Sequence, residues 1–230
     1  MTDKAVKPAL HARGLTRRYG DLTALGPLDV KIPVGQRVSL VGANGSGKTT
    51  LMRLVSGLLE PTEGQVEIMG EPVGSLEARA EISYIPDDPV LYDDLSVREH
   101  IEYLGPLYGE QRWKERGDEL MERLGIAHRA DDLPSGFSRG LRQKTSLAIG
   151  FLRPFSVLMV DEPFVGLDEP GRQALLSLLD DVAARGSTVI VASHQLDLVG
   201  RSDRCIALQE GAITYDGAPK DVDVAKLVGM

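Results

Sequence analysis

The segment "GANGSGKT", residues Gly42–Thr49, decides how the rest of the sequence is interpreted. It matches the pattern G-x-x-x-x-G-K-[ST] and lies between the apolar run "RVSLV" and the helical pattern "TTLMRLVSG". A strand before this pattern and a helix after it are the context of a phosphate-binding loop. Its glycines let consecutive N–H groups converge on phosphate oxygens, and the helix N-terminus adds a positive dipole end. The alternative, a glycine-rich turn without a ligand, disagrees with both the pattern and its context.

The loop also carries two side chains with a chemical role. Lys48 is expected to bring a point charge to the β- and γ-phosphates, and the Thr49 hydroxyl is expected to bind Mg²⁺. A second apolar run, "VLMVDEP", ends in Asp161 and Glu162. Burial of this strand would force both acids out at its C-terminal end, where open α/β sheets bind ligands. Asp161 would hold Mg²⁺, and Glu162 would polarise the water that attacks the γ-phosphate.

Simpler interpretations exist for these polar residues. The two acids could merely decorate a helix N-terminus, although a neighbouring phosphate loop argues against that. His194 follows a third apolar run, "TVIVAS", and could reach the γ-phosphate from the same sheet edge. A lone histidine at a strand end is more often structural.

Composition sets limits on the class of protein. The chain has 230 residues, 42% of them hydrophobic, and a net charge of −8, which argues against broad binding to a nucleic-acid backbone. A local cationic groove remains compatible with that charge. The single Cys205 excludes an intrachain disulfide and a cysteine-rich metal site. No apolar run reaches the roughly 18 residues of a membrane span, and the first residues lack a signal-peptide core, so a cytoplasmic protein is expected.

The order of predicted elements indicates an α/β core with an insertion. Short strands fill the first third, and strand–helix alternation resumes after "VLMVDEP" and ends in a late β pair. Between them, Ser96 and Glu99 form a capping box that begins a helix. Further helices are predicted around Trp113–Leu124 and after "GFSRG", which gives a helical insert from about residue 95 to 152.

In this order, the motifs resemble the nucleotide-binding domain of ABC transporters over nearly the whole chain. The resemblance implies an α/β P-loop NTPase core with a mixed sheet, an N-terminal antiparallel β part and the helical insert, in one domain over residues 1–230. It implies catalytic roles for Glu162, Lys48 and the switch histidine His194. Tyr19 in "RRYG" would stack on adenine. The residues implied to bind nucleotide are Tyr19, Gly42, Ala43, Asn44, Gly45, Ser46, Gly47, Lys48, Thr49 and Thr50.

The resemblance also gives a role to "GFSRGLRQK", Gly136–Lys144, an unusually basic segment for an acidic chain. "FSRGL" occupies the place of the family's signature, which binds the γ-phosphate of ATP held by the partner subunit. Ser138, Arg139 and Gly140 would make this contact in trans. The segment Gly166, Leu167 and Asp168 looks like the D-loop, which crosses between subunits. An ordinary helix cap is the alternative interpretation of the signature.

Two positions depart from the family pattern. The usual signature is Leu-Ser-Gly-Gly-Gln, but here Arg139 replaces the first Gly and Leu141 replaces the Gln. Asp87, in "YIPDDPVLY", stands where the family usually has a Gln that senses Mg²⁺ and the attacking water. Asp87 would then be a third metal ligand beside Thr49 and Asp161, or only a loop residue. Both departures look like those of bacterial export-type members, which often carry "FSKGM"-like signatures.

The expected function is therefore ATP binding and hydrolysis that powers a membrane transporter, with ATP and Mg²⁺ as cofactors. The expected partners are a second ATPase subunit, as a homodimer, and an integral membrane permease at the cytoplasmic face of the membrane. Export is the expected direction, and no nucleic-acid partner is expected. The alternatives are a non-transport ABC ATPase acting on DNA or ribosomes, and an ATP-binding scaffold without turnover. The long coiled-coil insertion, the fused second cassette and the basic surface typical of the first alternative are not evident. Retention of Lys48, Asp161, Glu162 and His194 argues against the second.

Overall fold

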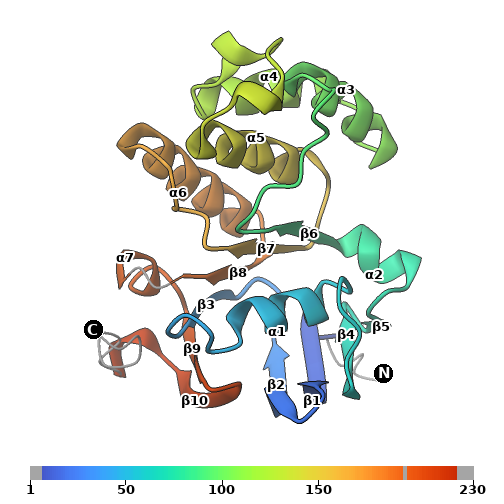
Figure 1. Ribbon diagram of the computed structural model, residues 1–230, viewed down its shortest axis with the longest axis vertical. Helices are drawn as coiled ribbons and strands as arrows, with labels where there is room; N and C mark the ends of the chain where they lie inside the picture. The colour runs from blue at the N-terminus through green and yellow to red at the C-terminus, as the bar shows by residue number, and fades with distance from the viewer. Residues whose placement is uncertain (1–6, 194–195, 222–230) are drawn as a thin grey trace, which may run out of the picture.

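Two sheets organise the protein. The computed structural model describes residues 7–193 and 196–221, and Figure 1 shows the antiparallel sheet at one end and a group of helices at the other. The antiparallel sheet consists of β1 (Leu10–Tyr19), β2 (Leu22–Ile32), β4 (Glu63–Ile68) and β5 (Glu71–Pro72), in the spatial order β2-β1-β4-β5. Its strands follow one another antiparallel, as the sequence predicts for the first third of the chain.

The second, mostly parallel sheet carries the motifs. In spatial order it consists of β10 (Ala212–Gly217), β9 (Arg204–Gln209), β3 (Arg37–Val41), β8 (Thr188–Ala192), β7 (Val157–Asp161) and β6 (Ile82–Ile85). Only β10 runs antiparallel to its neighbour, which makes the sheet mixed. The predicted P-loop NTPase fold with its late β pair is confirmed.

Successive side chains of the central strands point to opposite faces of the sheet, and each face packs into its own hydrophobic core. In β7, Val157 and Met159 pack in one core with α1 (Lys48–Val55) and the antiparallel sheet. Leu158 and Val160 point the other way, into a second core that contains the helical residues near the top of Figure 1. Both strands β7 and β8 are buried along their whole length, which is typical of parallel strands covered on both faces.

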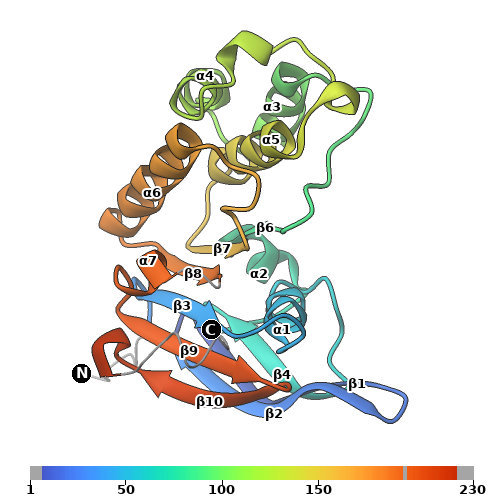
Figure 2. The same ribbon diagram turned by 60° about the vertical axis from the view of Figure 1, so that its left-hand side comes forward.

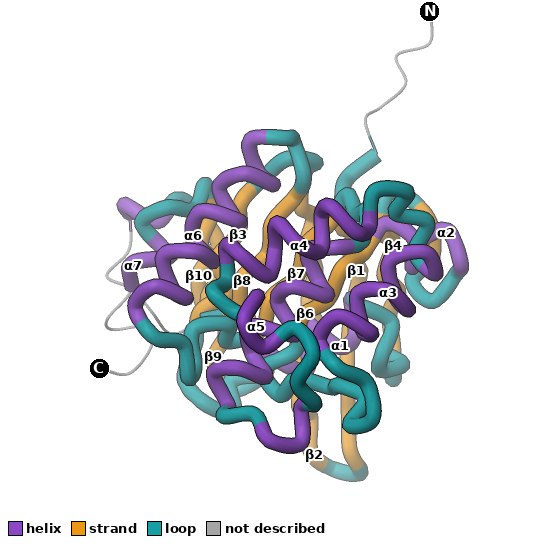
Figure 3. The backbone as a smooth tube through the Cα atoms, turned by 90° about the horizontal axis from the view of Figure 1, so that it is seen from above, coloured by secondary structure: helices purple, strands orange, loops and turns teal. Residues whose placement is uncertain are grey.

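The remaining helices lie mostly above this sheet. They are α2 (Leu76–Glu81), α3 (Val97–Leu107), α4 (Trp113–Arg123), α5 (Arg139–Leu152), α6 (Glu169–Ala184) and α7 (Leu196–Val199), with 3₁₀ turns at Ala127–Arg129, Pro134–Gly136 and Pro219–Asp221. Helices α3, α4 and α5 form the helical insert, at the end opposite the antiparallel sheet (Figure 2). Seen from the insert, these helices lie in front of the core sheet (Figure 3). The two short helices α2 and α7 were not predicted from the sequence.

No helix in residues 7–193 and 196–221 combines the length and apolarity needed to cross a membrane.

The predicted capping box is present at the start of α3. The Ser96 hydroxyl accepts a hydrogen bond from the Glu99 N–H at 3.2 Å, and the Glu99 carboxylate accepts from the Ser96 N–H at 2.7 Å. These bonds hold the pKa of Glu99 below its usual range, the backbone bond from Ser96 contributing most. Behind the cap, Val97 and Ile101 are buried in the second core. The cap therefore fixes where the insert leaves the sheet.

Replacing Ser96 by Ala should lower the free energy of unfolding by about 1 kcal/mol, since one N–H of the first turn then loses its acceptor. Urea denaturation of the purified chain measures this. Ser135→Ala, in an exposed turn of the same insert, is the matched control and should change stability by less than about 0.5 kcal/mol. Equal stability of the Ser96 variant and the control would show that the cap contributes nothing.

Candidate active site

The glycine-rich loop joins β3 to α1 at the C-terminal edge of the core sheet. Gly42 lies so close to the neighbouring strand that a Cβ atom there would collide with the Leu208 carbonyl oxygen. Gly47, the residue before α1, has a left-handed φ of 106°, and no side chain in the described part of the chain caps the helix. The N–H groups of the first helical turn are thus left for an anion, as a phosphate-binding loop requires.

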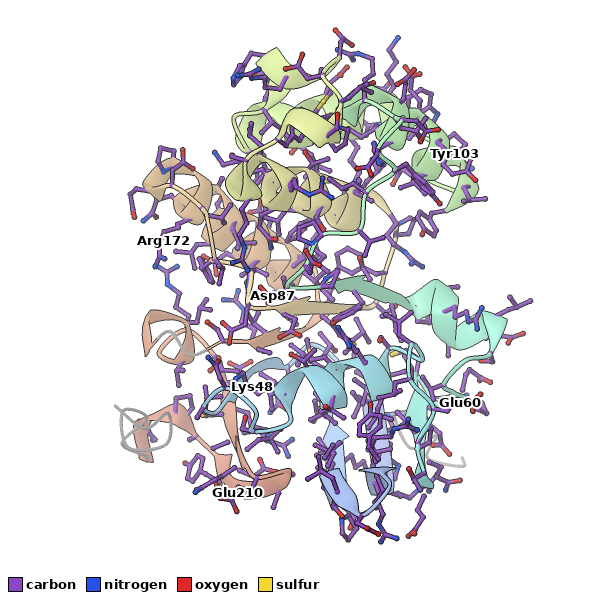
Figure 4. The ribbon with its side chains drawn as sticks, in the orientation of Figure 1. Lys48, Glu60, Asp87, Tyr103, Arg172 and Glu210 are labelled. Atoms are coloured by element: carbon purple, nitrogen blue, oxygen red, sulfur yellow. The ribbon has the colours of Figure 1, made fainter. Side chains whose placement is uncertain are left out.

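Lys48 is held against this loop. Its ammonium group donates to the carbonyl oxygens of Gly42 at 2.7 Å and Ala43 at 3.3 Å, and lies 3.7 Å from a Glu162 carboxylate oxygen. The side chain is almost fully buried, so these oxygens compensate a cation that has little contact with water. Figure 4 shows Lys48 at the start of α1, below Asp87. The Lys48 charge is thereby held within the glycine-rich loop.

Asp161 ends β7 as a fully buried carboxylate. The sequence predicted that it would be forced out of the strand end, and the structure places it at that end but covered. Burial raises the pKa of Asp161 above its usual range; Thr49 and Lys48 act against this shift, and the carboxylates of Glu162 and Asp87 add to it. Neither carboxylate oxygen has a hydrogen-bond partner of normal geometry among the described residues.

An unpaired buried carboxylate costs several kcal/mol, so this site favours a bound cation. A carboxylate next to a threonine hydroxyl fits Mg²⁺, which takes few protein ligands and completes its shell with water and phosphate oxygens. Accordingly, the described residues contain no cluster of three or more His, Cys, Asp or Glu that could hold a metal unaided. Asp161 and Thr49 are the residues that fit Mg²⁺ best.

Glu162 has an unusual backbone conformation. Its φ is 43°, in the left-handed region that non-glycine residues rarely adopt, and its N–H donates to the Ala192 carbonyl of β8 at 2.8 Å. Such strain is typical of functional positions that the surrounding structure holds in place. The side chain remains mostly buried beside Lys48, at the mouth of the loop. Glu162 is thus positioned to act on a molecule bound there.

Lys48, Thr49 and Glu162 line one hollow of about 680 Å³, large enough for a nucleotide. Its lining consists of Leu22, Thr23, Ala24, Asn44, Gly45, Ser46, Gly47, Lys48, Thr49, Thr50, Asp87, Glu162 and Glu210. Of the predicted site residues, Gly42, Ala43 and Asp161 are not part of this lining. Leu22, Thr23, Ala24 and Glu210 were not singled out from the sequence. Hydrogen bonds from the Gly211 N–H to the Ser46 oxygen and from the Gly26 N–H to the Gly211 oxygen bring the β2 and β9–β10 segments to the loop.

Tyr19 lies beside this hollow rather than in its lining. It ends β1, pairs with Leu22 of β2 and is half exposed. The Arg17 guanidinium group lies 4.4 Å from the centre of its ring, over one face. The geometry is compatible with a base on the opposite face, and stacking of Tyr19 on adenine stays a prediction. His194, the predicted switch histidine, lies outside the described residues.

The signature segment begins α5. Ser138 is its N-cap, and the hydroxyl accepts from the Leu141 N–H at 3.3 Å. Gly140 packs so tightly on the predicted D-loop that a Cβ atom would collide with the Gly166 carbonyl oxygen. Ser138, Arg139 and Gly140 are all absent from the lining of the hollow in their own chain. Both interpretations of the serine are therefore compatible with the structure, because a capping hydroxyl can also face a ligand.

Each of the three cations in "GFSRGLRQK" contacts a different acid. The Arg139 guanidinium donates to Asp87 at 3.1 Å, Arg142 lies 3.8 Å from Asp93, and Lys144 lies 2.7 Å from Asp168. Asp168 follows Gly166 and Leu167 and caps α6 by accepting from the Gly171 N–H at 3.1 Å. The Lys144 ammonium holds the pKa of Asp168 below its usual range. The signature helix is thereby tied to the D-loop by packing and by charge.

Comparison with known proteins agrees with the resemblance to ABC transporter ATPases that the sequence motifs indicate. The sequence model of the ABC transporter family matches residues 25–165. The SkfA peptide export ATP-binding protein SkfE of Bacillus subtilis (strain 168) is 32% identical, over 90% of this chain and 88% of its own length. The phosphonates import ATP-binding protein PhnC 2 of Pseudomonas syringae pv. syringae (strain B728a) is 34% identical, over 93% of this chain and 86% of its own.

Solved structures of ATP-binding cassettes have the same fold as this chain. A structure of an ATP-binding subunit of an ABC transporter superposes with a TM-score of 0.87 at 30% identity, over 93% of this chain and 91% of that chain. The dimeric ATP-binding cassette MJ0796 bound to ADP and Pi has a TM-score of 0.81 at 23% identity, over 91% of this chain and 98% of that chain, and so shares the fold. Since the sequence match, the relatives and the site geometry coincide, this chain belongs to the ABC transporter family, as one of its ATP-binding ATPases.

Proposed function

We propose that the chain is the ATPase subunit of an exporter and works as a homodimer at the cytoplasmic face of a membrane, bound to a separate permease. The observation that carries the proposal is the position of the signature. The N-terminus of α5 is suited to an anion, with an exposed Ser138 and two arginines, yet it lies outside the hollow of its own chain. A second copy that brings its signature to this hollow would complete the site.

The residues in the hollow and around it have distinct tasks in this proposal. The loop N–H groups and Lys48 bind the phosphates, and Tyr19 stacks on the base. Asp161 and Thr49 hold Mg²⁺, which when bound neutralises charge that develops on the phosphates during transfer. Glu162, whose carboxylate lies beside Lys48, orients and polarises the attacking water. His194 would contact the γ-phosphate. The partner's signature, with its helix dipole, would stabilise the same phosphate from the other side.

Support for export comes from two observations. The signature resembles the export-type pattern, and SkfE, a similar protein over almost the whole chain, is a peptide export protein. PhnC 2, an import protein, has a similar identity to this chain, so the proposal of export depends on the signature rather than on overall similarity. The dimeric cassette MJ0796 shares the fold and supports pairing. A DNA- or ribosome-directed ATPase is the rival, and the net charge of −8 argues against it.

A groove between the core and the helical insert supports a membrane partner. It has a volume of about 680 Å³, and its lining comes from the segment that follows α1, from α2 and β6, and from the C-terminal ends of α3 and α5. Leu76 and Leu107 line it and are 78% and 63% exposed. Leu58 and Tyr108 add further exposed apolar surface. Exposed apolar side chains gathered around a groove between the core and the insert are suited to bind a permease segment.

Leu76→Glu should weaken membrane attachment by at least about 10-fold, because a charge would have to enter the contact. Co-sedimentation with membranes that contain the permease measures this, and the ATPase rate of the isolated chain should stay within about 2-fold. Val34→Glu, in the turn between β2 and β3 and outside the groove lining, is the control and should bind like the parent. Unchanged attachment of the Leu76 variant would remove the groove from the proposal.

Glu162→Gln should reduce ATP hydrolysis by about 100-fold or more, equivalent to about 3 kcal/mol of transition-state stabilisation. The amide keeps the shape but cannot polarise water as a carboxylate does. ATP should then accumulate a dimer, seen by light scattering. Glu169→Gln, at an exposed acid of α6, should hydrolyse ATP normally. Parent-like turnover by the Glu162 variant would reject its catalytic role.

The pairing of loop and signature can be tested by crosslinking. Asn44 and Ser138 are both exposed, so Asn44→Cys and Ser138→Cys in one chain with Glu162→Gln should give an intermolecular crosslink only with ATP. Native Cys205 is buried, and burial raises the pKa of its thiol to about 11, so it should not react. Asn44→Cys with Glu60→Cys is the control, because Glu60 lies on another side of the core (Figure 4). A yield indifferent to ATP would reject the sandwich.

A further inference from the structure

The N-terminus of α5 concentrates positive charge. Within the described chain, the first turn of this helix holds Arg139 and Arg142 and no acidic residue. Cations are unfavourable there, because the helix dipole already places positive charge at this end. An anion from elsewhere in the structure would therefore stabilise this end of the helix. In the single chain, Asp87 supplies one, with its carboxylate 3.1 Å from the Arg139 guanidinium.

Asp87 belongs to two sites at once. It follows β6 and lies between α5 and the start of α1 in Figure 4. Its carboxylate contacts the signature on one side, and the residue lines the nucleotide hollow on the other. The acids that hold the other two cations, Asp93 and Asp168, are not part of that lining. Of the three ion pairs, only the one between Asp87 and Arg139 connects the signature to the hollow.

The contact is suited to exchange. The Arg139 side chain is 60% exposed and that of Asp87 44%, and an exposed pair of this kind favours the paired state by a factor of about five at most. A guanidinium group binds phosphate through two parallel hydrogen bonds, which are stronger. A γ-phosphate presented by a partner subunit would thus draw Arg139 away from Asp87.

We propose that Asp87 and Arg139 form an exchange pair. In the open chain, Asp87 holds the Arg139 guanidinium beside the hollow. On closure, Arg139 binds the γ-phosphate held by the partner subunit, and the released Asp87 carboxylate faces the nucleotide and Mg²⁺ of its own chain. Arg139 is thus a phosphate-binding residue, and Asp87 is a positioning residue that opposes closure. The inference rests on the proposed dimer.

The exchange pair also accounts for both departures from the family pattern. Arg139 stands where the signature usually has Gly, and Asp87 stands where the family usually has Gln. The two residues are 52 positions apart in the sequence, yet they are the two ends of one ion pair. A Gly at the first position could not form the pair, and a Gln at the second would form it without charge.

A double-mutant cycle tests the exchange without measuring hydrolysis. In the full chain with Glu162→Gln, the dissociation constant of the ATP-dependent dimer is measured by sedimentation for the parent, Asp87→Asn, Arg139→Gln and the double variant. Asp87→Asn should lower the constant by about 3- to 25-fold, because each dimer breaks two such pairs on closing. Arg139→Gln should raise it by at least about 10-fold. The double variant should match Arg139→Gln within about 2-fold.

The control and the opposing outcomes are distinct. Asp93→Asn removes the same charge from the same segment, but its pair with Arg142 lies away from the hollow, so the constant should change by less than about 2-fold. An unchanged constant for Asp87→Asn overturns the exchange. So does a decrease that persists with Arg139→Gln, since Asp87 would then act directly on nucleotide. No dimer in the parent at any ATP concentration overturns the proposed function and the exchange with it.

Discussion

Asp161 is a carboxylate that the fold has removed from water; the Thr49 hydroxyl lies beside it, but among the described residues neither carboxylate oxygen has a hydrogen-bond partner of normal geometry. The parallel strands β7 and β8 are buried on both faces, so an acid at the end of β7 is enclosed by the same packing that stabilises the sheet. The elements around it can be understood as a response to this charge. The loop before α1 brings Lys48 and Thr49 to its side, and β8 fixes the backbone of Glu162. A nucleotide-bound cation would neutralise the negative charge of this buried carboxylate.

The link between this site and the insert consists of a few close contacts around one glycine pair. Gly140 and Gly166 touch through backbone atoms, and the adjacent pair of Lys144 and Asp168 adds charge to the same junction. Because nothing compressible lies between them, the signature helix and the D-loop segment are expected to move together. Asp87 lines the nucleotide hollow and contacts Arg139 at the start of the signature helix. The ion pair between these two residues therefore connects the insert to the hollow.

Local patterns explain what could be predicted from the sequence. The phosphate loop, the acid-terminated strand and the capping box of Ser96 and Glu99 are short-range signals, and each forms where it was expected. The lining by Glu210 and by the β2 segment could not be predicted, because it depends on hydrogen bonds that join Gly211 to Ser46 and to Gly26. The full burial of Asp161 and its contact with Thr49 likewise arise from tertiary packing. The pairing of Arg139 with Asp87 has no local signal at all.

The three ion pairs of α5 differ in their exposure to solvent, and this gives the helix a graded response to ionic strength. The cation and the acid are 60% and 44% exposed in the pair of Arg139, 30% and 76% in that of Arg142, and 11% and 59% in that of Lys144. Dissolved ions screen exposed charges far more than enclosed ones. Rising salt would therefore weaken the two arginine pairs before it weakens the pair of Lys144 with Asp168. Ionic strength would thus loosen the contact of Arg139 with Asp87 while the contact of Lys144 with Asp168 persists.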